Sequence, residues 1–142
     1  MTTVQSPTTS ATLATGAGSA LEFSLDGAAM LDLAPEIHRQ RLVIEGIPAE
    51  EITDLAISGY LRGLSDVCEM VLLTTPVTHR SDRFGWAGWI HWETSGAHFY
   101  AWEQPKLFFS VDIYTCKAFD PIAAISYTES YFETSQIVAK EF

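Results

Sequence analysis

Hydrophobic and polar positions divide the chain into a polar head and a patterned body. Residues 1–20 are mostly Thr, Ser, Ala and Gly, with too few apolar side chains to offset the entropy cost of ordering. We therefore predict that residues 1–20 are a disordered tail and that residues 21–142 form a single domain. The more apolar stretch 21–37 is expected to pack as a short strand or turn against the body or a neighbouring subunit.

Helix signals occur at two places in the body. After Pro48, residues 49–68 repeat apolar and small side chains at a three-four spacing, which predicts a helix with one buried face. That face would hold Ile52, Leu55, Ala56, Gly59, Gly63 and Val67. Its two glycines would allow close packing on a sheet. Residues 120–132 begin with Asp-Pro, a combination typical of a helix start.

β-Branched and aromatic residues fill the remaining apolar segments, which predicts strands. The predicted strands are residues 41–46, 69–79, 84–93, 95–102, 106–116 and 134–142. The order is therefore strand, helix, four strands, helix, strand. This order predicts an α+β domain, a two-layer sandwich whose mostly antiparallel sheet has helices on one face.

One predicted strand separates apolar from polar side chains, because side chains alternate between the two faces of a strand. One face would hold Leu107, Phe109, Val111 and Ile113, and the other Ser110, Asp112, Tyr114 and Cys116. The first face belongs to the core, and the second could line a site.

Composition and charge narrow the range of partners. The chain of 142 residues is 47% hydrophobic and 12% aromatic, which suits one domain with one sizeable core. Its formal net charge of −10 excludes an electrostatic footprint for nucleic acid or an anionic membrane, and it favours a small cationic ligand or a basic partner. Two separated cysteines, no secretion signal and no long apolar run predict a soluble, cytoplasmic protein. The four histidines show no metal-ligand spacing, so no metal site is predicted.

Two segments, FGWAGWIHWETSGAHFYAW (84–102) and FFSVDIYTC (108–116), resemble the small prokaryotic class of S-adenosylmethionine decarboxylases. The family pattern runs Tyr-Gly-Val-Ser-Gly, Glu-Ser-His, Ile-His-Thr-Trp-Pro and Val-Asp-Leu-Phe-Thr-Cys-Gly. Gly88 matches its second glycine, and Ser95 falls on the serine at which family members cleave themselves. The further matches are Glu45, Trp102, Val111, Asp112, Thr115 and Cys116.

The resemblance implies a self-processing enzyme. In the family, the serine hydroxyl attacks the preceding carbonyl, and elimination from the resulting ester leaves a chain that begins with a pyruvoyl ketone. This built-in cofactor acts as an electron sink in the decarboxylation of S-adenosylmethionine for the synthesis of spermidine and other polyamines. Ser95 would then be the source of the pyruvoyl group and Cys116 the proton donor to carbon.

The substrate-binding candidates are Glu45, Asp112 and Trp86. The first two match family acids, and an aromatic face such as that of Trp86 can bind a sulfonium cation or an adenine ring. Because the family usually pairs its domains into larger sheets, the resemblance also implies a homodimer, and the aromatic surplus suits such an interface.

Three processing positions depart from the family pattern. Thr94 replaces a glutamate, Ala87 a serine, and Tyr100 the histidine that acts as an acid/base group during processing. A phenol is a poor proton acceptor at neutral pH. His98 lies two residues away on the same strand face and is the candidate to replace the histidine, although that shift moves a side chain by about 6–7 Å.

Three functions therefore stay open. The first is an active pyruvoyl-dependent decarboxylase, which requires cleavage at Thr94–Ser95. The second is a relative that does not process itself and that binds S-adenosylmethionine or regulates a catalytic partner. The third is an uncleaved enzyme with different chemistry on a nucleoside or sulfonium substrate, with Glu45, His98 or Tyr100 as acid/base groups.

Overall fold

The computed structural model describes residues 10–15, 19–24 and 30–142, with side chains described from residue 30 onward. The chain falls into two compact units, Met1–Glu36 and Ile37–Phe142. In the first unit, strands β1 (Ser10–Thr15) and β2 (Ser19–Ser24) pair in antiparallel fashion.

This pairing lies within and beside the segment for which a disordered tail is predicted. Pairing of two short strands through their backbones needs no buried side chain, so the composition of the segment does not signal it. Residues 1–9 and 16–18 of the predicted tail lie outside the described residues. In the stretch predicted to pack as a strand or turn, Met30, Leu31 and Leu33 are exposed. The tail ending at residue 20 and the domain starting at residue 21 remain predictions.

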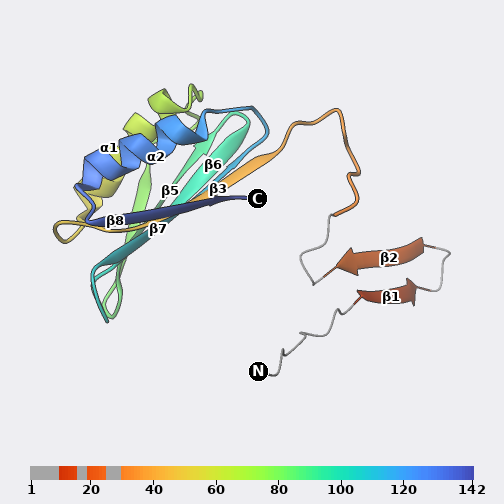
Figure 1. The fold of residues 1–142 in the computed structure, drawn as a ribbon, viewed down its shortest axis with the longest axis horizontal. Helices are drawn as coiled ribbons and strands as arrows, with labels where there is room; N and C mark the ends of the chain where they lie inside the picture. The colour runs from red at the N-terminus through yellow and green to blue at the C-terminus, as the bar shows by residue number, and fades with distance from the viewer. Residues whose placement is uncertain (1–9, 16–18, 25–29) are drawn as a thin grey trace, which may run out of the picture. The chain divides into compact units, whose positions relative to one another are not determined.

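The second unit contains one antiparallel sheet of six strands in the order β4-β5-β6-β7-β3-β8. The strands are β3 (Gln40–Ile47), β4 (Val77–Ser81), β5 (Gly85–Trp92), β6 (Ser95–Trp102), β7 (Phe108–Thr115) and β8 (Gln136–Glu141). The helices α1 (Asp54–Val67) and α2 (Pro121–Phe132) lie over the same face of this sheet (Figure 1). The predicted α+β sandwich is therefore confirmed.

Helix α1 begins later than its pattern predicts, and it buries a different face. Thr53 is the N-cap, with its hydroxyl accepting a hydrogen bond from the Ala56 N–H at 3.1 Å. The buried side chains of the helix are Ile57, Tyr60, Leu61, Leu64 and Ser65. The prediction that Leu55 is buried was wrong, since this residue is 79% exposed. Two apolar series with the same spacing overlap in this helix, and periodicity alone does not select between them.

The two glycines of α1 face the second helix, where the sequence predicted a sheet. A Cβ atom at Gly59 would meet the Tyr131 hydroxyl, and one at Gly63 would meet the Tyr127 hydroxyl. Both tyrosine hydroxyls donate hydrogen bonds to α1 carbonyls, Tyr127 to Tyr60 at 3.1 Å and Tyr131 to Ala56 at 3.0 Å. The glycines therefore allow the α2 tyrosines to approach the α1 backbone.

The predicted strand 69–79 is mostly a loop. β4 begins only at Val77, and a single bridge between Leu72 and Trp92 ties the loop to β5. Glu69 ends α1 in the left-handed conformation, with φ of 55°, and Pro76 has no N–H to donate to a ladder.

Alternation along the strands gives the sheet two unlike faces. On the helix-covered face, Phe109, Val111 and Ile113 are fully buried, as the alternation in residues 107–116 predicts, and so is Phe99 on β6. Leu107, predicted for the same face, precedes β7 and is half-buried. We call the other side the open face. In the described part of the chain it includes Arg41, Glu45, Trp89, His98, Tyr100, Ser110, Asp112, Tyr114 and Val138.

Candidate functional site

The predicted cleavage site lies in the hairpin between β5 and β6. Trp92 pairs with Ser95, so Glu93 and Thr94 form a two-residue loop and Ser95 opens β6. The Thr94 carbonyl is the group that a Ser95 nucleophile would attack. It accepts a hydrogen bond from the Cys116 backbone N–H at 2.9 Å. The structure thus places the backbone of Cys116 beside the Thr94–Ser95 bond.

Two hydroxyls and one thioether meet at this turn. Thr94 Oγ1 and Ser95 Oγ lie 3.0 Å apart, and each lies 3.8 Å from Met70 Sδ. Met70 is buried, and the loop that contains it is held across the turn by a 2.9 Å hydrogen bond from the Glu93 N–H to the Val71 carbonyl. Sequence reasoning missed Met70, because only the return of this loop to the β5–β6 hairpin places it there.

Cys116 directly follows β7, with a half-buried free thiol. The next residue, Lys117, donates from Nζ to the Glu69 carbonyl at 2.6 Å. The segment after α1 and the segment after β7 are therefore joined to each other as well as to the Thr94–Ser95 turn.

The acid/base candidates lie on the other face of the sheet. Ser95 has the parity of the buried Ala97, whereas His98 and Tyr100 point to the open face and are exposed. The register places His98 opposite Asp112 and Tyr100 opposite Ser110. The structure therefore groups His98 and Tyr100 with the open-face residues and separates their side chains from that of Ser95.

Two predicted substrate-binding carboxylates lie on this open face. Arg41 donates to both oxygens of Asp112, at 3.0 and 2.8 Å. The hydrogen bond and the charge of Asp112 raise the pKa of Arg41 above its ordinary value. Ser110 Oγ donates to Glu45 Oε1 at 3.3 Å. Sequence reasoning missed Arg41 as a site residue, although it lies on the same strand and the same face as Glu45.

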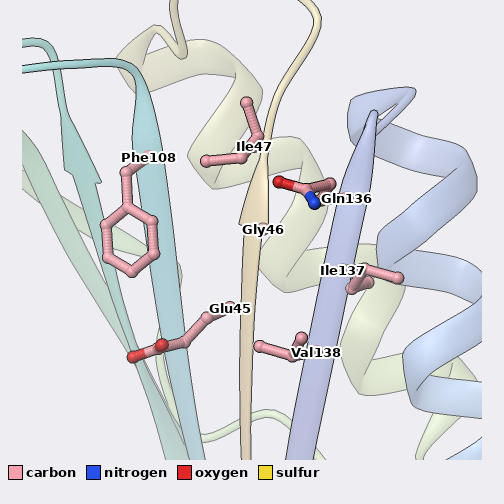
Figure 2. Close-up of a pocket in the computed structure, with 7 residues that line it drawn as sticks. All are labelled: Glu45, Gly46, Ile47, Phe108, Gln136, Ile137 and Val138. Carbon is pink, nitrogen blue, oxygen red and sulfur yellow. The ribbon is translucent and has the colours of Figure 1, made fainter.

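A hollow of about 300 Å³ adjoins Glu45 (Figure 2). Its lining comes from three neighbouring strands and consists of Glu45, Gly46, Ile47, Phe108, Gln136, Ile137 and Val138. Glu45 supplies the one charged side chain in a lining that is otherwise apolar apart from Gln136. Such a hollow suits a small group that carries a positive charge or donates hydrogen bonds.

Trp86 lies away from both groups, on the opposite side of the sheet from the open face. It is partly buried and packs against the core. The Arg80 guanidinium lies 5.4 Å from its ring centroid, and Glu103 binds that guanidinium at 2.7 and 2.8 Å. A cation of this chain therefore already occupies one face of the ring.

Within the described residues, no three His, Cys, Asp or Glu side chains gather in a way that could hold a metal ion. No helix in this part of the chain is long and apolar enough to cross a membrane.

The fold and the site define a two-layer α+β protein with a serine in a hairpin turn and an acidic hollow on the uncovered side of its sheet. A family model described as S-adenosylmethionine decarboxylase matches residues 44–142. The chain therefore belongs to the S-adenosylmethionine decarboxylase family. No curated protein matches the chain.

Among solved structures, the adenosylmethionine decarboxylase from Aquifex aeolicus VF5 is similar to this chain. The TM-score is 0.59 at 18% sequence identity, and the match covers 75% of this chain and 89% of that chain. At this identity the likeness shows a common fold alone.

Proposed function

We propose that this protein is a pyruvoyl-dependent decarboxylase that makes its own cofactor by cleavage at Thr94–Ser95 and acts on S-adenosylmethionine or a related substrate in polyamine synthesis. The observation that supports it most directly is the 2.9 Å hydrogen bond from the Cys116 N–H to the Thr94 carbonyl. A backbone N–H aimed at this oxygen would stabilise the negative charge that develops when the carbonyl is attacked. The residues at the turn therefore fit the formation of a pyruvoyl group.

The proposed self-cleavage needs no reactant other than the chain itself and one water molecule. Ser95 Oγ bonds to the Thr94 carbonyl carbon, whose bond to the Ser95 nitrogen breaks, and the hydroxyl proton passes to that nitrogen. Loss of the Ser95 Cα proton then expels the Thr94 carboxylate. Water replaces the nitrogen, ammonia leaves, and a ketone remains at the start of residues 95–142.

Once formed, the pyruvoyl ketone would supply an electron sink for a substrate that carries a primary amine. The chain's own residues would bind and protonate this substrate. Glu45, in its largely apolar hollow, would attract a cationic group, and Cys116 would return a proton to carbon. Asp112, held by Arg41, would position its neighbours and make little direct contact with a ligand.

The second candidate is a family member that stays uncleaved and binds S-adenosylmethionine or regulates a partner. It is favoured by the surroundings of the Ser95 hydroxyl, whose hydrogen-bond partners are the Thr94 hydroxyl and the Met70 thioether. Neither group is a base, and His98 and Tyr100 lie on the opposite face of the sheet. An uncleaved enzyme with other chemistry would use these same open-face residues.

The intact mass of the purified chain under denaturing conditions tests the first candidate against the others. We expect two fragments, 1–94 and 95–142, the second with a ketone in place of its terminal amine, together with release of carbon dioxide from S-adenosylmethionine. The Ser95→Ala chain is the control and should give a single mass. A single stable mass for the wild-type chain would rule out the pyruvoyl mechanism for the isolated protein.

The same proposal includes a homo-oligomer in the cytoplasm. Tyr100, Trp102 and Tyr114 expose aromatic surface on the open face, and aromatic side chains are enriched at protein interfaces. Sedimentation velocity at two concentrations would check the assembly, with a monomer at both concentrations contradicting it.

A further inference from the structure

We propose that Met70 and Thr94 are positioning residues that hold the Ser95 hydroxyl for attack on the Thr94 carbonyl. The inference rests on the proposed self-cleavage, but it concerns only the first step, the transfer of the acyl group from nitrogen to oxygen. Neither side chain is a base, and neither side chain forms a covalent bond during this step.

The Thr94 hydroxyl, the Ser95 hydroxyl and the Met70 thioether form a chain of hydrogen bonds in which only the thioether can be the last acceptor. Each hydroxyl has one proton. If Ser95 donates to Thr94, then Thr94 is free to donate to Met70, and if Thr94 donates to Ser95, then Ser95 donates to Met70. In both cases the thioether is the final acceptor, because it has no proton to give. Met70 thus restricts both hydroxyls to the rotamers that reach its sulfur atom.

The position of Met70 is itself fixed by contacts outside the turn. Its N–H donates to the Ser65 carbonyl at 2.8 Å, and its side chain is buried. The preceding residue, Glu69, is anchored by Lys117, next to the cysteine whose N–H binds the Thr94 carbonyl. The nucleophile and the carbonyl that it would attack are therefore held by the same pair of joined segments.

This arrangement explains how the Thr94 position can serve processing without an acid. The Thr94 hydroxyl orients the Ser95 hydroxyl through a neutral hydrogen bond, which is weaker than one to a carboxylate. The Met70 thioether provides a second contact that fixes the position of the Ser95 hydroxyl. A thioether is a weak acceptor and does not draw the proton away from Ser95. The contacts therefore orient the Ser95 hydroxyl but do not remove its proton, and we expect slow cleavage.

The test measures acyl transfer separately from the later elimination. Hydroxylamine attacks an ester, releases the Ser95 hydroxyl and leaves a hydroxamate on Thr94, so it cuts the chain wherever the ester forms. The sequence contains no asparagine and therefore no Asn-Gly bond, a common background site for this reagent. The rate of cutting at Thr94–Ser95 is followed by intact mass on the folded, freshly purified chain.

We expect Met70→Leu and Thr94→Val each to slow hydroxylamine cleavage by about threefold to tenfold, as expected for loss of a weak hydrogen bond. Thr94→Ser should restore the wild-type rate. The matched controls are Met30→Leu and Thr74→Val, which change an exposed methionine and an exposed threonine. In spectra of the chain labelled with ¹³C at the methionine methyl groups, the Met70 signal should shift in Ser95→Ala, whatever the cleavage rate.

Wild-type rates in both Met70→Leu and Thr94→Val, or no hydroxylamine cleavage of the wild-type chain, would overturn the inference. If Met70→Leu fails to fold, the Thr94 variants decide, because this side chain is exposed. Hydroxylamine cleavage that the variants slow, without spontaneous formation of a ketone, would support the inference and reject the proposed function. Spontaneous cleavage that neither variant slows would support the proposed function and reject the inference.

Discussion

The two faces of the sheet differ in what fixes their side chains. On the helix-covered face, Phe99 stacks on Phe109 with ring centroids 5.5 Å apart and also packs against Tyr60 and Phe132 at 5.2 Å. On the open face, neighbouring side chains meet through polar contacts such as Arg41–Asp112. Packing therefore dictates residue type on one face, whereas the other face can change its chemistry at small cost in stability.

This difference explains why the departures from the family pattern are tolerated. Tyr100, which the resemblance aligns with the family histidine, is 46% exposed on the open face, and Thr94 is exposed in a turn. Neither position supports the core. A chain can exchange such residues and keep its fold, so the fold alone does not determine whether processing survives.

A pair of adjacent residues tests this contrast most strongly. Phe99→Ala should lower the free energy of unfolding by about 3–5 kcal/mol, since it opens a cavity among the rings of Tyr60, Phe109 and Phe132. Tyr100→Ala, one residue further on the same strand, should cost less than about 1 kcal/mol. Urea denaturation measures both values. Similar losses of unfolding free energy in the two variants would show that both faces contribute equally to stability and would contradict the proposed difference between them.

The buried thiol of Cys68, on the helix-covered side of the sheet, should make the stability of the folded chain sensitive to high pH. Burial, with a smaller contribution from the charge of Asp120, raises the pKa of Cys68 from 9.0 to about 12. Above pH 9 the unfolded chain loses this proton while the folded chain keeps it, so stability should fall as the pH rises from about 9 to about 12. One such group contributes at most about 1.4 kcal/mol per pH unit.

Denaturation of the wild-type and Cys68→Ala chains at pH 7 and pH 10.5 checks this expectation. The pH 7 values give the packing cost of the substitution alone. The variant should then lose less stability than the wild-type chain on going to pH 10.5. Some dependence should remain, because burial also raises the pKa of Tyr127 to about 12. Equal losses in the two chains would contradict the assignment to Cys68.

The smallest effect is expected at the open-face ion pair. Arg41 and Asp112 have side chains that are 46% and 34% exposed, so solvent screens their attraction. Asp112→Asn should lower stability by less than about 1 kcal/mol, and the difference should shrink in 1 M salt. A larger loss that is independent of salt would show that the open face is buried in solution, as a homodimer through this face would require.

The sequence was sufficient to predict the order of elements in the second unit. It was also sufficient to predict the buried face of β7, because side chains alternate along a strand and only one of its two faces buries Phe109, Val111 and Ile113. It was not sufficient for α1, where two overlapping apolar series compete, or for the loop that contains Met70. Both depend on which distant segment packs there, α2 in one case and the β5–β6 hairpin in the other.

The candidate site shows the same limit. The family resemblance singled out Ser95 and Cys116 without predicting that they are neighbours, and the β6–β7 register, in which Ser95 pairs with Thr115, brings their backbones together. Parity along β6 also separates Ser95 from His98 and Tyr100, a signal that was present in the sequence. The Met70 thioether was not predictable, because only the return of the loop after α1 to the β5–β6 hairpin brings it to the turn.

The strand order has a consequence for a chain cut at Thr94–Ser95. The first fragment would hold β3, β4 and β5, and the second β6, β7 and β8, yet β3 lies between β7 and β8 in the sheet. Each fragment would therefore supply strands that the other needs as neighbours. A break in this turn would convert the folded unit into an interlaced heterodimer, whose halves would migrate together until a denaturant separates them.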